Sequence, residues 1–208
     1  HLVADDHEVV AVSRRQVTVG ENPQIKWRRV ADPAGPHAWA DALSGVDAVI
    51  HLSARSHAPS KGARDELAVY RTANVATTQA LAEQARAAGV ARFVFVSSVK
   101  AMGERTQVAF RETDRPTPED SYGISKLESE YALAGALAGS GTTFTIVRPP
   151  LVYGPGVKAN LRSLTRAVLR GWPLPFGRVQ NSRSFLASAN LADLLVHCLQ
   201  HPAAAGAT

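Results

Sequence analysis

The chain has 208 residues, of which 45% are hydrophobic and 20% charged, a balance typical of a globular protein with one substantial core. Its net charge of +5 comes from scattered basic side chains, and it has neither a membrane-length apolar run nor a signal-like N-terminus, so we expect no nucleic-acid partner and no membrane contact. The single cysteine, Cys198, excludes an internal disulfide and a cysteine-rich zinc site, so we expect a cytoplasmic protein and assign no metal site.

Five segments of the chain are predicted to be β-strands, and several are nearly unbroken runs of Val, Ile and Phe, as expected of strands covered on both faces. In chain order they are Glu8–Val12, Ile25–Val30, Val46–Leu52, Arg92–Ser97 and Phe144–Val147. Between them, Arg64–Ala88 repeats its apolar residues at spacings of three and four, which predicts a helix that Gly89 closes. Strands that alternate with helices indicate right-handed crossovers, so residues 1–153 are predicted to form a doubly wound α/β domain with a parallel sheet.

The sequence after Gly154 differs from the preceding part because it is rich in proline and glycine. Two further helices are predicted there, at Asn160–Arg170 and Asn190–Gln200, and the tail from Pro202 is expected to be loose. We therefore expect residues 154–208 to form a smaller region that packs beside the sheet.

A tyrosine and a lysine lie four residues apart where the chain is predicted to enter a helix. If this helix begins near Asp120, Tyr122 and Lys126 lie one turn apart on the same face. A tyrosine is a poor base at neutral pH unless a cation favours its phenolate, and Lys126 could supply that charge. The preceding strand brings Ser98 to the carboxyl edge of the sheet, where such sheets bind their ligands. Ser98, Tyr122 and Lys126 together indicate a proton-transfer site for an alcohol or a ketone.

Further short motifs surround these residues and follow one another along nearly the whole chain. They are DAVIHLSA (47–54), RTANVATTQAL (71–81), FVFVSSVKAMGE (93–104), SYGISKLESE (121–130), IVRPPLVYGPG (146–156) and RSFLASANLADLL (183–195). On these motifs the sequence resembles the extended short-chain dehydrogenase/reductases, and among them the NAD-dependent epimerase/dehydratase family that acts on nucleotide sugars. The stretches VKAMGE, RPPLVYGPGVKAN and PLPFG resemble bacterial polysaccharide-type UDP-sugar 4-epimerases. The resemblance implies a Rossmann-like domain with a smaller C-terminal substrate-binding region.

The resemblance also implies a role for each matching residue. Ser98 matches the catalytic serine, Tyr122 the acid/base, and Lys126 the partner of that tyrosine on the cofactor ribose. Cofactor binding is assigned to Tyr122 and Lys126, to residues at or near strand ends, to Asn74 in the predicted helix, and to Arg14, which departs from the family pattern. The residues at or near strand ends are Asp32, Leu52, Ser53, Ala54, Ser97 and Pro149.

For the substrate, Arg183 matches the arginine that pairs with a nucleotide diphosphate, a role that suits its planar fork of donors. Asn160 and Phe176 resemble residues around the phosphates and the uracil, although Asn160 is equally explained as a helix N-cap. Ser98 and Tyr122 would also contact the substrate at its reacting oxygen. The expected partners are a UDP-sugar and a second copy of the chain, in a homodimer that forms through two of its helices.

Two features depart from the family pattern. The family begins with a strand and a G-x-x-G-x-x-G turn whose backbone approaches the cofactor pyrophosphate, and the sequence contains no such segment. We therefore expect a fragment without the first βα unit and the C-terminal end, which by itself would bind cofactor poorly. After the second strand, where an acidic residue would bind the ribose of NAD, stand Arg14 and Arg15. NAD is expected from the resemblance, and NADP stays open.

The expected function is that of a nucleotide-sugar 4-epimerase. Tyr122 would remove the proton of the sugar C4 hydroxyl, Ser98 would bond that oxygen, and Lys126 would lower the pKa of the tyrosine. A 4,6-dehydratase would carry an acidic pair where Val99 and Lys100 stand. Two alternatives stay open: an NADPH-dependent keto-sugar reductase, favoured by the two arginines, and a non-catalytic NAD(P)-binding regulatory protein of the same fold.

Overall fold

The computed structural model describes residues 2–15, 22–56, 65–156, 159–174 and 177–208. All five predicted strands form, with shifts of only one or two residues at their ends: β1 (Val9–Ser13), β2 (Ile25–Arg29), β3 (Ala48–His51), β4 (Arg92–Val96) and β5 (Thr143–Val147). Two short strands were not predicted, β6 (Leu151–Tyr153) and β7 (Phe185–Ala187), because three residues carry too little pattern to identify a strand.

The helices connect and follow these strands. They are η1 (Leu2–Asp5), α1 (Ala40–Leu43), α2 (Glu66–Tyr70), the π-helical η2 (Arg71–Ala76), α3 (Thr77–Ala87), η3 (Val99–Ala101), α4 (Ser121–Leu137), α5 (Ala159–Leu169), α6 (Ser188–Gln200) and η4 (Pro202–Ala204). No helix within the described ranges is long and apolar enough to cross a membrane.

All described strand pairs are parallel, as predicted, but they form three separate sheets: β1–β2, β3–β4–β5 and β6–β7. The sequence predicted a parallel sheet from which the first βα unit is absent. In the described ranges no strand bonds β1 to β3, so the β1–β2 pair is held by side-chain packing instead. Val30, which follows β2, is buried in the cluster that contains Val49 and Phe93, and Val12 packs against it.

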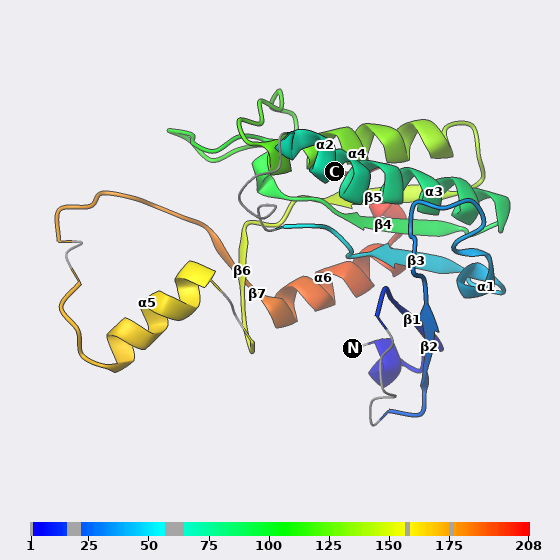
Figure 1. Ribbon diagram of the computed structural model, residues 1–208, viewed down its shortest axis with the longest axis horizontal. Coiled ribbons are helices and arrows are strands. Elements are labelled where there is room, and N and C mark those ends of the chain that lie inside the picture. Colours follow the sequence, from blue (N-terminus) through cyan, green and yellow to red (C-terminus); the bar gives the residue numbers. More distant parts are fainter. Residues whose placement is uncertain (1, 16–21, 57–64, 157–158, 175–176) are drawn as a thin grey trace.

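Helices cover both faces of the central β3–β4–β5 sheet, which confirms the doubly wound α/β class (Figure 1). Side chains of β4 alternate between the faces: Phe93 and Phe95 pack toward α3 and α4, and Val94 packs against Leu195 and Cys198 of α6. All three β4 side chains are fully buried, and each contributes about 1.5–3 kcal/mol to folding. The carboxyl ends of these strands are thereby held on a rigid layer.

The predicted helix over Arg64–Ala88 is one continuous run of helical residues in its described part, but it changes type in the middle. The π-helical turn η2 separates α2 from α3 and contains Asn74, whose side chain bonds outside the helix. Single π-helical turns inside α-helices are frequent at functional sites. Gly89 ends the run with a positive φ of 76°, as its position predicted.

Helix α6 lies in the region predicted to sit beside the sheet, and it packs directly on the sheet. The guanidinium group of Arg92, at the start of β4, donates two hydrogen bonds to the Cys198 carbonyl at 2.8 and 3.1 Å. This cation satisfies a carbonyl in the last turn of α6, where no further helical N–H follows. Helix α5 lies apart from the sheet (Figure 1). The region 154–208 therefore combines a helix of the sheet layer with a projecting helix.

Candidate active site

The candidate site lies at the carboxyl ends of β3, β4 and β5, where the chain turns into η3 and where α4 begins. Asp120 is the N-cap of α4: its Oδ1 accepts a hydrogen bond of 2.6 Å from the Gly123 amide. The predicted helix start is therefore confirmed, and an aspartate cap of this kind contributes about 1 kcal/mol to helix stability. Tyr122 stands in the first turn of α4, half-buried at the sheet edge.

The structure brings Ser98 and Tyr122 together although 24 residues separate them in the chain (122 − 98). Ser98 is the N-cap of η3, directly after β4, and lies close enough to Tyr122 to affect its phenol. Burial raises the pKa of Tyr122 above its ordinary value, and the Ser98 hydroxyl opposes that rise. The ring of Tyr70, from α2, lies 6.0 Å from the Tyr122 ring, centroid to centroid.

Lys126 lies one helical turn beyond Tyr122, but its ammonium group is directed at the sheet. Its Nζ donates a 2.8 Å hydrogen bond to the carbonyl of Val96 and lies 4.1 Å from the centroid of the Phe95 ring. The residue is 1% exposed, and burial lowers the pKa of Lys126 to about 7, against the opposing charge of Glu130.

The role expected of Lys126, to lower the pKa of Tyr122, stays a prediction. After burial and Ser98, the charges that act on Tyr122 are those of Asp120, which raises its pKa, and Lys100, which lowers it. The reason is geometric, because the Val96 carbonyl holds the Lys126 ammonium group within the core. The cation that acts on the phenol comes from η3, outside the predicted triad.

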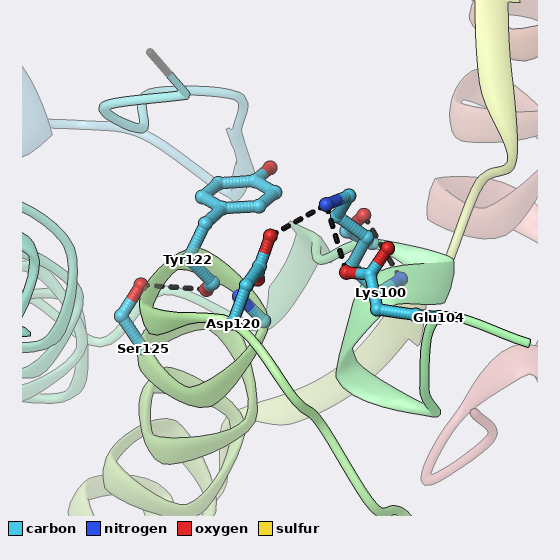
Figure 2. Close-up of polar contacts among 7 residues, drawn as sticks. Lys100, Glu104, Asp120, Tyr122 and Ser125 are labelled. Carbon is cyan, nitrogen blue, oxygen red and sulfur yellow. Dashed lines mark hydrogen bonds and ion pairs between the residues drawn. The ribbon is translucent and has the colours of Figure 1, made fainter. Parts of the chain in front are cut away.

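Lys100 is thus a site residue that the sequence analysis missed. There it served only as an argument against a dehydratase. Its Nζ lies 2.5 Å from Oδ2 of Asp120 and 2.8 Å from Oε1 of Glu104. Figure 2 shows the Lys100 side chain directed at both carboxylates, with the Tyr122 ring beside Asp120. The signal available in the sequence was weak, because a lysine in a loop is usually solvated.

Asn74 connects the segment after β3 to helix α4. Its Oδ1 accepts from the Arg55 amide at 2.7 Å, and its Nδ2 donates to the Arg55 carbonyl at 3.2 Å and to Oγ of Ser125 at 2.9 Å. Just before Arg55, Leu52 is 63% exposed and Ser53 is also exposed, while Ala54 is half-buried. The predicted cofactor segment therefore presents an apolar surface at the sheet edge, tied to α4 by one buried amide.

A buried ion pair beneath the site was also missed. Oε1 of Glu130, a residue only 3% exposed, accepts from Oγ of Ser97 at 2.5 Å and from Nε of Arg148 at 3.0 Å, and its Oε2 pairs with Nη2 of Arg148 at 2.5 Å. A charge in the protein interior requires such a partner. Glu130 could have been suspected because it lies on the α4 face of Tyr122 and Lys126, at i+8 and i+4.

The remaining predicted residues lie around this centre at varying distances. Pro149 is buried and its carbonyl accepts from the Val99 amide at 3.0 Å, which joins the end of β5 to η3. Asp32 and Arg14 are exposed after β2 and β1, and Asp32 lines a shallow cavity of about 340 Å³. The cavity lies beside the separate β1–β2 pair and is lined in addition by residues such as Arg29.

The other predicted substrate residues, Asn160, Phe176 and Arg183, are not brought to Ser98 and Tyr122 by any described contact. Arg183 is exposed in the segment before β7, and none of the described polar contacts joins it to Ser98 or Tyr122. Asn160 lies in the first turn of α5, but its side chain is outside the described part of the chain, and Phe176 lies outside the described residues altogether. Within the described ranges, no group of His, Cys, Asp and Glu residues could hold a metal ion.

Known proteins share this architecture. The model of the "NAD dependent epimerase/dehydratase family" matches residues 1–208. A UDP-glucose 4-epimerase of Vibrio cholerae is 46% identical over 166 residues, which cover 78% of this chain and 51% of that protein. Among solved structures, MoeE5 in complex with UDP-glucose and NAD is 30% identical, with a TM-score of 0.79 over 96% of this chain and 66% of that one.

A double mutant of DesIV, a dTDP-glucose 4,6-dehydratase from Streptomyces venezuelae with NAD and DAU bound, is 25% identical. Its TM-score is 0.80, over 96% of this chain and 64% of that one. The chain thus spans about half the length of the Vibrio cholerae relative, and 66% and 64% of the two solved chains. Because the family model matches every residue, the chain belongs to the NAD-dependent epimerase/dehydratase family.

Proposed function

We propose that the protein to which this chain belongs is a nucleotide-sugar 4-epimerase that uses NAD. The observation that carries the proposal is the placement of Ser98, at the end of β4, beside Tyr122, in the first turn of α4, at the carboxyl edge of a parallel sheet. The relatives support the substrate class, because one is a UDP-glucose 4-epimerase and another is crystallised with UDP-glucose and NAD. The substrate we infer is a UDP-hexose or a UDP-N-acetylhexosamine.

The residues near Tyr122 fit the nicotinamide half of a dinucleotide. Exposed Leu52 offers an apolar surface, and the Lys126 ammonium group has three donors, of which the Val96 carbonyl takes one in the described contacts. In the proposal the other donors of Lys126 hold ribose hydroxyls, which requires its ammonium group to turn from the core toward the sheet edge. NAD, when bound, accepts a hydride from the sugar and returns it. We assign no residue to the pyrophosphate, because these 208 residues contain no G-x-x-G-x-x-G turn.

In this proposal the protein residues handle the proton. Tyr122 takes the proton from the sugar C4 hydroxyl and later gives it back, and the Ser98 hydroxyl bonds the same oxygen. To take that proton Tyr122 must be in its phenolate form; burial raises the pKa of Tyr122, and Ser98 and the Lys100 cation, which favour the phenolate, oppose that rise.

A keto-sugar reductase that uses NADPH is a second candidate. Arg14 and Arg15 are both exposed directly after β1, where guanidinium groups would suit a 2′-phosphate. A purified protein that retains recycled NAD and interconverts sugars favours the epimerase. Consumption of one NADPH for each sugar that is reduced favours the reductase.

The larger assembly and the role of the C-terminal part belong to the same proposal. We infer a cytoplasmic homodimer that forms through α3 and α4, where Tyr131 is 64% exposed, and a substrate-binding role for part of residues 154–208. Sedimentation of wild-type and Tyr131→Arg proteins would test the dimer, because a buried arginine at a dimer interface shifts the protein to monomers.

The test of the function is the Tyr122→Phe variant of the full-length protein. We expect C4 epimerisation of UDP-sugars to fall by about 10²–10⁴, the usual contribution of a general acid/base. Tyr131→Phe is the matched control, because it removes an exposed hydroxyl from the same helix and leaves the site intact. A Tyr122→Phe protein that epimerises at the wild-type rate would rule out the proposed role.

A further inference from the structure

Lys100 contacts Ser98 through its backbone and contacts the residues on either side of Tyr122 through its carbonyl and its side chain. Its amide donates to Oγ of Ser98 at 3.2 Å. Its carbonyl faces Gly123 so closely that a Cβ at Gly123 would lie 2.5 Å from that oxygen. One residue thus touches the serine on one side and the first turn of α4 on the other.

The side chain of Lys100 makes the second connection to α4, through Asp120. One carboxylate oxygen of Asp120 caps the helix at the Gly123 amide, 2.6 Å away, and the other pairs with the Lys100 ammonium at 2.5 Å. In the chain, Tyr122 lies between Asp120 and Gly123, the two residues that this cap joins (Figure 2). Glu104 holds the ammonium from the opposite side at 2.8 Å.

The Lys100–Asp120 ion pair contributes little to the stability of the fold. The side chains of Lys100 and Asp120 are both 40% exposed, and ion pairs of that exposure contribute about 0–1 kcal/mol to stability. Their position relative to the phenol is more informative. From the elements packed around Tyr122, the groups that act on it are Ser98 and Lys100 of the η3 segment, Asp120 of α4 and Tyr70 of α2.

We propose that Lys100 is a positioning residue that holds Ser98 and Tyr122 in register, and that its pairing with Asp120 sets the charge balance at the Tyr122 phenol. The role in turnover rests on the proposed function, but the effect on the phenol does not. The two charged partners act on the phenol with opposite signs, because the ammonium group favours the phenolate and the carboxylate disfavours it.

The first test measures the phenol without turnover. In the full-length protein with ring-labelled tyrosine, the Tyr122 signal is identified by its loss in Tyr122→Phe and is titrated in each variant by NMR. We expect Lys100→Met to raise the pKa of Tyr122 and Asp120→Asn to lower it. Asparagine keeps the N-cap, so Asp120→Asn removes the charge and preserves the helix start.

The controls separate charge from folding. Lys100→Arg keeps the cation and should leave the titration near that of the wild type. Lys26→Met removes a lysine–carboxylate ion pair far from α4, the pair with Glu8 at 3.0 Å in the β1–β2 sheet. It should leave the titration of Tyr122 unchanged. A purely structural disturbance would shift Tyr122 in the same direction in Lys100→Met and Asp120→Asn, and that result would overturn the proposal.

The second test measures turnover. We expect kcat for C4 epimerisation to fall about tenfold in Lys100→Met with little change in KM, because a misplaced acid/base lowers the rate of the chemical step. Lys100→Arg should recover most of kcat. A wild-type kcat in Lys100→Met would contradict positioning. If the wild-type protein epimerises no UDP-sugar but the opposite titration shifts are found, the proposed function fails and the role of Lys100 at the phenol stands.

Discussion

The sheet edge at α4 and the projecting helix α5 are both helical regions, but they differ in what covers their apolar residues. In α4, Leu133 is fully buried and Lys126 is 1% exposed, whereas in α5 Val168 is 57% and Leu169 80% exposed. Figure 1 shows α4 against the sheet and α5 extended away from it. The difference teaches that a site whose side chains must keep fixed orientations is built where the core holds them. An amphipathic helix pattern alone does not fix the orientation of a side chain.

The largest expected effect is the loss of the buried ion pair beneath the site. Glu130→Gln in the full-length protein should lower the free energy of unfolding by about 3–5 kcal/mol, because it leaves the Arg148 cation without its carboxylate in the interior. Urea denaturation measures this loss. Glu128→Gln is the control on the same helix: it breaks the exposed pair with Arg71 and should cost at most about 1 kcal/mol. Equal losses would contradict the contrast between buried and exposed pairs.

The close approach of η3 to α4 predicts the next effect. Gly123→Ala should destabilise the protein by about 1–3 kcal/mol and reduce activity, because the new Cβ would lie 2.5 Å from the Lys100 carbonyl. Gly135→Ala, in the same helix with no atom within 4 Å of the new Cβ, should instead stabilise by about 0.5–1 kcal/mol. Thermal denaturation of both variants tests the opposite signs, and a stabilised Gly123→Ala protein would refute the contact.

Lys126 predicts a dependence of stability on pH. Burial lowers its pKa to about 7 in the folded protein, whereas an unfolded lysine titrates near about 10.4. Between these values the unfolded chain binds more protons, so the free energy of unfolding rises with pH, by up to about 1.4 kcal/mol per pH unit from this group.

Urea denaturation between about pH 7 and about pH 9 measures this slope. Lys126→Met should flatten it, because methionine has no proton to lose, and Lys26→Met, an exposed lysine, should leave it as in the wild type. A slope that survives in Lys126→Met would assign the titration to another group.

The smallest effect is expected in α5. Leu169→Ala should change the free energy of unfolding by no more than about 0.5 kcal/mol, because the side chain is 80% exposed. The matched change in α4, Leu133→Ala, should cost about 2–5 kcal/mol because it opens a cavity in the core. A large loss from Leu169→Ala in the full-length protein would mean that part of the protein outside these 208 residues covers α5.

Much of the fold could be predicted because local patterns carry it. The five strands, the Asp120 cap and the end at Gly89 follow from apolar runs and from capping chemistry. The short strands β6 and β7 could not be predicted, because pairing depends on neighbours distant in the chain.

The candidate site shows the same division. The sequence by itself determined which residues stand at the strand ends, and the motifs indicated Ser98, Tyr122 and Lys126 as a set. Only the tertiary structure decided where their charges act. It directs Lys126 at the Val96 carbonyl, pairs Glu130 with Arg148 and brings Lys100 to Asp120. The reason is physical: the pKa of a side chain depends on burial and on charges within a few ångströms, and those neighbours come from segments that only folding brings together.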